Sequence, residues 1–276
     1  MRVEDRRFTN LISPYDVRDY KFACVAETPL PDTFDCTANE NVNVNIAVKD
    51  QGSTGSCVAH ACSSVVEFHS KRQTGENTIF STEFIYGYRP DGYYVGEGMY
   101  PREALKTLQK VGDVPLTKLR GNHDCPEAME AVNAQLEELK EVAYPHRVST
   151  YMQVNSTTGV KQALMKYGPV LISMPWHVDY KLKDGVYTFE NPETRGCHAV
   201  LIYGWNEQGW LVQNSWGHGW GRKGKFILPF DFKWYEAWLI TDSIVDDENI
   251  VRPTDKWYVR VFNKIINFFG RLFKKK

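Results

Sequence analysis

The sequence predicts an α+β fold of two packed lobes, one mainly helical and one mainly of strands. Before about residue 145, apolar residues recur at helical intervals, whereas later segments are short β-rich runs separated by glycines. No internal repeat or low-complexity linker separates the halves, so we expect two lobes that share a cleft. We divide the chain into an N-terminal arm (1–45), a helical lobe (46–145), a β-rich lobe (146–245) and a basic amphipathic C-terminal tail (246–276).

The first half combines the irregular arm with predicted helices. The arm is polar and rich in turn residues. Residues 56–71, SCVAHACSSVVEFHSK, contain no Gly or Pro and place small and apolar residues on a helical spacing, which predicts a buried helix with Cys57 at its start. Residues 81–89, 101–112 and 127–142 predict further helices; the second ends at Gly112 and the third exposes its polar positions to water.

The second half predicts one short helix and then strands. Residues 159–168, GVKQALMKYG, are the helix. Four apolar runs bounded by glycine turns predict strands: PVLISMPW (169–176), HAVLIYGW (198–205), GWLVQNSW (209–216) and GKFILP (224–229).

The composition is that of a globular protein large enough for an enzyme. Its 276 residues are 42% hydrophobic and 24% charged, and the formal net charge of -1 gives no indication of a nucleic-acid partner. No apolar run reaches the length of a membrane span and the first residues have no apolar signal core, which predicts a cytoplasmic location. The six cysteines form no C-x-x-C pair, so we expect free thiols and no metal site.

The C-terminal tail has its own pattern. Residues 257–276 alternate aromatic and aliphatic residues with Lys and Arg on a helical spacing. The plainer interpretation is a terminal helix docked on its own protein. The alternative is peripheral contact with a membrane, in which the apolar side chains enter lipid and the lysines meet headgroups.

Cys57 is the candidate nucleophile. A thiol at a helix start lies among unsatisfied N–H groups and the positive end of the helix dipole, which favour the thiolate. Gly52 and Gly55 allow a tight turn into this helix. Gln51, six residues before Cys57, carries a side-chain amide that can bind an oxyanion.

His198 is the candidate base among the seven histidines. His60 and His69 share the predicted helix with Cys57, where side-chain directions do not bring an imidazole back to the helix start. His198 begins an apolar strand instead. Asn214 follows in the next strand, close enough across a hairpin for its amide to orient the imidazole.

Three segments together resemble the active-site motifs of papain-like (C1 family) cysteine peptidases. They are DQGSTGSCVAHA (50–61), GCHAVLIYGW (196–205) and NSWGHGWG (214–221), in the order of that family. The resemblance covers roughly residues 30–240 and is closest in pattern to bacterial or phage members without a long propeptide. It implies a helical left lobe and an antiparallel β-barrel-like right lobe, with the active site in the cleft between them.

The resemblance implies a cysteine-type peptidase. Cys57 and His198 would form a thiolate–imidazolium pair, Asn214 would orient His198, and Gln51 would help to bind the oxyanion of a thioester-forming reaction without a cofactor. The implied partner is a peptide or protein substrate, with a protein inhibitor as a further partner. An amidase or acyltransferase acting on a cell-wall or isopeptide substrate is the alternative, followed by an inactive peptide-binding homologue.

The same resemblance supplies substrate-binding candidates. Residues 98–105, GMYPREAL, are similar to the segment that binds the substrate backbone, and GPVLIS (168–173) to a strand beside the specificity pocket. The candidates are Gly98, Met99, Tyr100, Pro101, Ser173, Ala199 and Trp216.

The chain departs from the family pattern at several positions. Thr54 replaces a disulfide cysteine, Val58 replaces a tryptophan and Met99 replaces a glycine. Cys197, beside His198, is either a small filler or a redox brake that forms a disulfide with Cys57.

Overall fold

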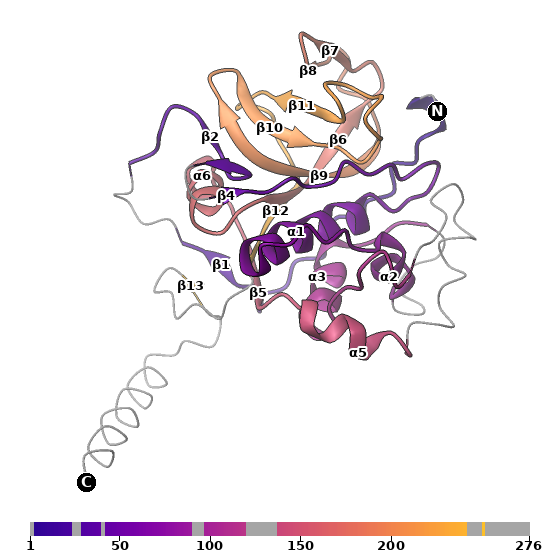
Figure 1. Ribbon diagram of the computed structural model, residues 1–276. Coiled ribbons are helices and arrows are strands. Elements are labelled where there is room, and N and C mark those ends of the chain that lie inside the picture. Colours follow the sequence, from indigo (N-terminus) through magenta and orange to yellow (C-terminus); the bar gives the residue numbers. More distant parts are fainter. Residues whose placement is uncertain are drawn as a thin grey trace.

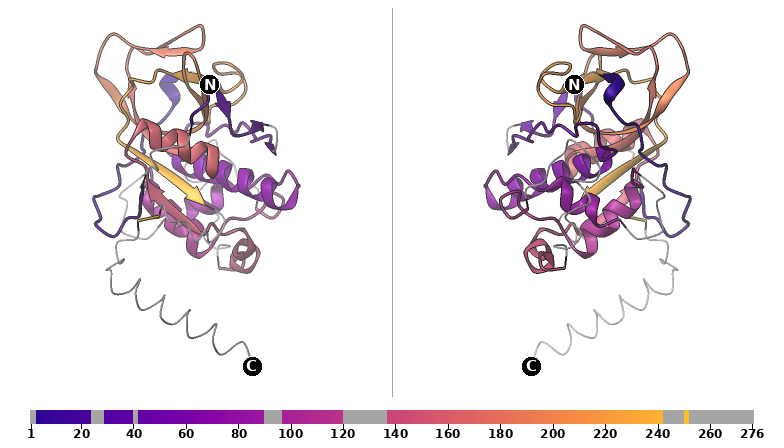
Figure 2. Two further views of the ribbon diagram at one scale, coloured as in Figure 1. Left: turned by 90° about the vertical axis from the view of Figure 1, so that its left-hand side faces the viewer. Right: turned by 90° about the vertical axis from the view of Figure 1, so that its right-hand side faces the viewer.

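The predicted two-lobed α+β architecture is confirmed. The computed structural model describes residues 3–23, 29–39, 42–89, 97–119, 137–241 and 250–251. Most of the helices form one lobe, below strands β6 to β11 in Figure 1, and the side views in Figure 2 show the same two parts. The predicted tail helix at 257–276, with its two interpretations, lies outside the described residues.

The helical lobe is built around one long buried helix, α1 (Cys57–Thr74). It begins at Cys57 as predicted, and its first 14 residues are buried. It ends where Gly75 adopts a left-handed conformation with φ of 76°, a common helix stop. Around it lie α2 (Thr82–Gly87), α3 (Pro101–Lys110), α5 (Lys140–Ala143) and the 3₁₀ turn η3 (Tyr144–His146); η1 (Val3–Asp5) is near the N-terminus. Most of the helix predicted at 127–142 lies outside the described residues.

The short helix predicted at residues 159–168 is α6 (Thr157–Lys166), which begins and ends two residues earlier. The hydroxyl of Ser156 caps it by accepting a hydrogen bond from the backbone N–H of Gly159 at 3.0 Å. Helix α6 lies against strands β6, β9 and β12 (Figure 1).

Most strands belong to one mixed sheet of the order β13-β1-β5-β12-β6-β9-β10-β11-β8-β7, with β2 paired to β9. Their bounds are β1 (Lys21–Phe22), β2 (Phe34–Asp35), β5 (Thr150–Gln153), β6 (Val170–His177), β7 (Lys181–Lys183), β8 (Val186–Thr188), β9 (Thr194–Asn206), β10 (Gly209–Gln213), β11 (Lys225–Leu228), β12 (Glu236–Thr241) and β13 (Ile250–Val251). A separate hairpin joins β3 (Ala38–Asn39) to β4 (Val42–Asn43).

The expected antiparallel barrel needs correction. The β1–β5 and β11–β8 pairs are parallel, and the described strands form an open sheet because β13 and β7 stand at its two ends. The four predicted strands are present as β6, β9, β10 and β11. The sequence pattern did not indicate β12, although all six of its residues are buried.

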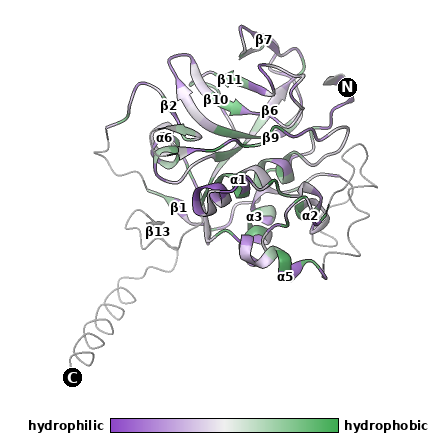
Figure 3. Ribbon diagram, in the orientation of Figure 1, coloured by the Kyte–Doolittle hydropathy of each residue, from purple (hydrophilic) through white to green (hydrophobic). Residues whose placement is uncertain are grey.

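Strand β9 is the element that joins the two lobes. It pairs with β6 and β10 and packs against α1. Hydrophobic residues are concentrated in β6, β9 and β10 (Figure 3), as expected for strands covered on both faces. His198 lies inside this strand, paired with Met174, because β9 begins at Thr194 and not at His198 as predicted.

The N-terminal arm is largely irregular, as predicted. From the N-terminus beside the strands it runs the length of the molecule to β1 (Figure 1). No helix among the described residues is long and apolar enough to cross a membrane.

Candidate active site

Cys57 lies at the start of α1 and faces β9. Its side chain is fully buried, and this burial raises the pKa of the thiol to about 11. The backbone groups of Ala199 and Val58 act in the opposite direction and lower this pKa. The expected activation of the thiol by the helix start is therefore outweighed in this arrangement.

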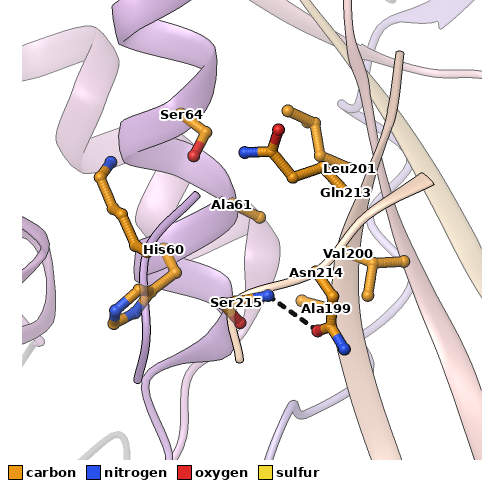
Figure 4. Close-up of a pocket in the computed structure, with 10 residues that line it drawn as sticks. His60, Ala61, Ser64, Ala199, Val200, Leu201, Gln213, Asn214 and Ser215 are labelled. Carbon is orange, nitrogen blue, oxygen red and sulfur yellow. Dashed lines mark hydrogen bonds between the residues drawn. The ribbon is translucent and has the colours of Figure 1, made fainter. Parts of the chain in front are cut away.

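His198 and Asn214 form the hydrogen bond that the sequence predicts. His198 Nε2 lies 2.8 Å from Asn214 Oδ1. The same oxygen accepts the backbone N–H of Ser215 at 2.8 Å, which Figure 4 marks with a dashed line. Because an N–H donor identifies that Asn214 atom as oxygen, Nε2 of His198 must carry the proton. Nδ1 is then the acceptor nitrogen, and it has no hydrogen-bond partner among the described residues. Burial lowers the pKa of His198 to about 4.

Two tryptophans surround the imidazole. Trp216 is tilted against it with ring centroids 5.0 Å apart, and Trp176 meets it edge to face at 5.2 Å. Trp216 is almost fully buried, so it shields the bond between His198 and Asn214 from water. Sequence reasoning gave no role to Trp176, which lies near the end of β6.

Gln51 is held by both ends of its side-chain amide. Its Oε1 accepts the hydroxyl of Ser215 at 2.6 Å, and its Nε2 donates to the carbonyl of Thr54 at 2.9 Å. An amide nitrogen carries two hydrogens, so one N–H remains for an oxyanion. The backbone N–H of Gln51 also donates to the carbonyl of Ser215 at 2.9 Å, which ties the segment before α1 to the one after β10.

The substrate-binding candidates divide between the two lobes. Gly98 and Met99 precede α3, Tyr100 is its N-cap, and Pro101 is its first residue. Ser173 and Ala199 are opposite each other in the β6–β9 pair. Their roles remain predictions.

The structure adds polar and aromatic residues that the sequence patterns did not reveal. Arg6, Phe8 and Asn10 of the arm contact the residues of the site, and Glu236 accepts a hydrogen bond from Ser173 at 3.1 Å. An aromatic residue within a polar, irregular stretch was the only signal for Phe8.

The sequence predicted free cysteines and no metal site. Cys36, Cys57, Cys62 and Cys197 form no disulfide among the described residues, as predicted, while Cys24 and Cys125 lie outside them. Within the described ranges, no group of three or more His, Cys, Asp or Glu residues could hold a metal ion. The redox brake remains a prediction.

The lobes and the Cys, His and Asn side chains between them define a papain-like protein. The chain belongs to the papain family of cysteine proteases, whose family model matches residues 30–231. This confirms the resemblance seen in the three sequence motifs.

Individual relatives agree with the family match. Cathepsin B-like cysteine proteinase 3 of Caenorhabditis elegans is 29% identical over 235 residues, covering 74% of this chain and 63% of the relative. Cathepsin K of Mus musculus is 27% identical over 217 residues, covering 73% of this chain and 60% of the relative. The chain thus spans less than two thirds of the length of these relatives.

A solved structure supports the fold. Xylellain, a cysteine protease from Xylella fastidiosa, superimposes with a TM-score of 0.72 at 22% sequence identity, covering 86% of this chain and 96% of that protein.

Proposed function

We propose that this protein is a cysteine-type peptidase that hydrolyses peptide bonds through a thioester acyl-enzyme on Cys57. The observation that carries the proposal is the hydrogen bond between His198 and Asn214, because it leaves Nδ1 of His198 as a proton acceptor next to the nucleophile's helix. Family membership favours the peptidase over the amidase or acyltransferase alternative.

In the acylation step one proton is transferred, and a C–S bond to Cys57 replaces the C–N bond of the substrate. The thiol proton of Cys57 passes to Nδ1 of His198, and the thiolate attacks the carbonyl carbon of the peptide bond. The backbone N–H of Cys57 and the remaining N–H of Gln51 stabilise the oxyanion. The C–N bond then breaks, and His198 returns the proton to the leaving amine.

Deacylation uses the same groups. His198 takes a proton from water, and the resulting hydroxide attacks the thioester carbonyl. The C–S bond breaks, the carboxylic acid leaves, and the proton on His198 restores the Cys57 thiol. In each step Asn214 keeps the imidazole in the required tautomer and orientation.

Several finer points belong to the proposal. The substrate is an extended peptide or protein segment that contacts Gly98 and Met99, and protein inhibitors are a further class of partner. The location is the cytoplasm, which the four described cysteines without disulfides support because reducing compartments keep thiols reduced.

Casein hydrolysis and active-site labelling test the reaction. We expect wild type, labelled by an epoxysuccinyl peptide, to carry one adduct at Cys57, and Cys57→Ala to carry none and to hydrolyse no casein. Cys62→Ala, on the same helix, is the control and should retain both properties. A folded protein whose Cys57 reacts readily with iodoacetamide but which hydrolyses no casein would contradict the proposal.

A further inference from the structure

A cavity of about 410 Å³ opens in the β-rich lobe, where the end of β6, strand β8 and the connection from β11 to β12 meet. Strand β8 stands at the top of Figure 1, away from the helical lobe. None of the residues that line the cavity belongs to the proposed catalytic or substrate-binding set. Its volume lies within the range of roughly 300–1,000 Å³ that is typical of small-molecule sites.

The wall of the cavity is aromatic. The rings of His177 and Phe189 stack face to face, with centroids 3.4 Å apart and an angle of 5° between their planes. The ring of Phe232 is nearly perpendicular to both, at 5.9 Å from His177 and 6.2 Å from Phe189. Phe189 is 41% exposed, so an apolar ring faces water. Because aromatic pairs prefer stacked or edge-to-face contacts, perpendicular rings favour a further planar ring in the cavity.

His177 supplies a hydrogen-bond donor within this wall. The Tyr187 hydroxyl accepts the backbone N–H of His177 at 2.9 Å and lies 3.2 Å from its Nδ1. This hydroxyl is buried and has no other acceptor among the described residues, so it donates to Nδ1. Nε2 therefore carries the ring hydrogen, and it has no partner in the described part of the chain. Burial lowers the pKa of His177, so the ring is uncharged near pH 7.

Two opposite charges flank Phe232 in the sequence. Asp231 and Lys233 both line the cavity, and both are exposed. Neither side chain forms an ion pair or a hydrogen bond with another described residue. Three consecutive residues thus present a carboxylate, an aromatic ring and an ammonium group to the same cavity.

These groups together fit one class of ligand. An aromatic α-amino acid carries a planar ring, and its ammonium and carboxylate groups are bonded to the same carbon. The ring would pack against Phe189 and Phe232, and the ammonium group would pair with Asp231. The carboxylate would accept hydrogen bonds from Lys233 and from Nε2 of His177. The interior of a polypeptide lacks both α charges and would leave Asp231 and Lys233 unpaired.

The cavity is separate from the proposed catalytic site. Tyr187 forms its inner wall, and the Tyr187 ring lies 5.1 Å from that of Trp176. Trp176 in turn lies 5.2 Å from the ring of His198. The aromatic side chains around His198 therefore lie between the cavity and the proposed base.

We propose that this cavity is a binding site for a free aromatic α-amino acid, distinct from the catalytic cleft. The inference concerns binding alone and goes beyond the proposed function. Free amino acids are end products of peptide-bond hydrolysis, so the site and the proposed reaction involve the same class of compound.

A fluorine NMR titration of the full chain with 4-fluoro-L-phenylalanine measures the binding. We expect a saturable change in the fluorine line width, with a Kd of about 1 mM or lower, and reversal of this change by L-phenylalanine. N-acetyl-L-phenylalanine amide keeps the ring but has neither charge. It should compete about tenfold less well or worse, because it cannot pair with the two charged side chains.

Substitutions in the cavity should weaken this binding. Asp231→Asn and Lys233→Gln each remove one charge and should raise the Kd about fivefold. Phe189→Ala removes an exposed ring and should raise the Kd about tenfold. Lys183→Gln, at an exposed position in β7 outside the cavity, and Tyr144→Ala, at an exposed position in the helical lobe, are the matched controls and should keep the wild-type Kd.

Labelling of Cys57 with an epoxysuccinyl peptide distinguishes the two sites. Binding that persists in the labelled protein and weakens in the cavity variants would support the inference, even if the protein hydrolysed no casein. Binding that labelling abolishes would place the amino acid in the catalytic cleft and overturn the inference. Equal Kd values in wild type, Phe189→Ala and Lys233→Gln would also overturn it, as would equal competition by the uncharged amide.

Discussion

At the scale of single residues, the site depends on polar side chains whose orientation is set by a second bond. Asn214 accepts from both His198 and the backbone of Ser215, which fixes its oxygen toward the imidazole. Gln51 is held at both ends in the same way. Under the proposed mechanism, such preorganised groups would act in the transition state without first having to be ordered.

Replacing Asn214 by Ala should lower kcat by about 100-fold with little change in KM, because His198 loses the partner that sets its orientation and tautomer. Steady-state kinetics on a peptide substrate measure both constants. Asn206→Ala, at the turn between β9 and β10, is the control and should keep the wild-type kcat. A rise in KM with unchanged kcat would show that Asn214 serves substrate binding instead.

Replacing Gln51 by Ala should also act on kcat, by roughly 10²- to 10³-fold, as is typical for loss of an oxyanion donor. The comparison is Gln109→Ala in α3, which removes a side-chain hydrogen bond to the carbonyl of Ser149. The expected result for Gln109→Ala is unchanged kcat. Equal losses in the two variants would mean that Gln51 has only a structural role.

At the scale of elements, close contacts fix how α6 and α1 approach each other. Gly168 follows the end of α6 with φ of 121°, and its N–H donates to the carbonyl of Ala163 at 3.2 Å. A Cβ at this position would lie 2.1 Å from Cε1 of Phe68 in α1. Both the backbone conformation and the packing therefore require glycine.

Gly168→Ala should reduce the free energy of unfolding by roughly 1–3 kcal/mol, as for other overpacked sites. Urea denaturation of the two proteins at one pH gives the difference. Gly219→Ala is the control because its Cβ would have no neighbour within 4 Å. If both substitutions changed stability equally, the contact with Phe68 would not be the cause.

At the scale of the whole molecule, the two lobes are joined by buried polar contacts as well as by apolar packing. His69 in α1 donates from Nε2 to the carbonyl of Ile240 in β12 at 3.2 Å. Burial, followed by the charge of Arg72, lowers the pKa of His69 to about 4. His69 and His198 are thus two of the buried histidines, and both are neutral at mild acidity.

These histidines make stability dependent on pH. Between about pH 6.5 and pH 4 the unfolded chain binds protons that the folded protein does not, so the free energy of unfolding should fall as the pH is lowered through this range. Urea denaturation at pH 7 and pH 5 tests this. His69→Gln should reduce the dependence, since one of the two groups is removed. An equal pH dependence in His69→Gln and wild type would exclude His69 as a source.

Much of the fold was predictable because local sequence patterns indicate its helices and strands. The helix beginning at Cys57 and the strands around residues 170–176, 198–205 and 225–228 follow directly from apolar spacing and glycine turns. The strand at residues 236–241 was missed because its charged and aromatic residues obscure the pattern, and its pairing with β5 and β6 is non-local. The open, mixed sheet likewise depends on pairings between distant segments.

The sequence by itself determined the family and the order of the motifs, and it predicted the nucleophile and its base, because these depend on residue types at fixed local spacing. Tertiary structure alone decided that Arg6, Phe8 and Asn10 lie in the cleft and that burial shifts the pKa values of Cys57 and His198 against their charged forms. The physical reason is that burial and long-range contacts arise only when segments far apart in the chain are brought together. No local pattern in residues 6–13 indicates which distant residues they contact.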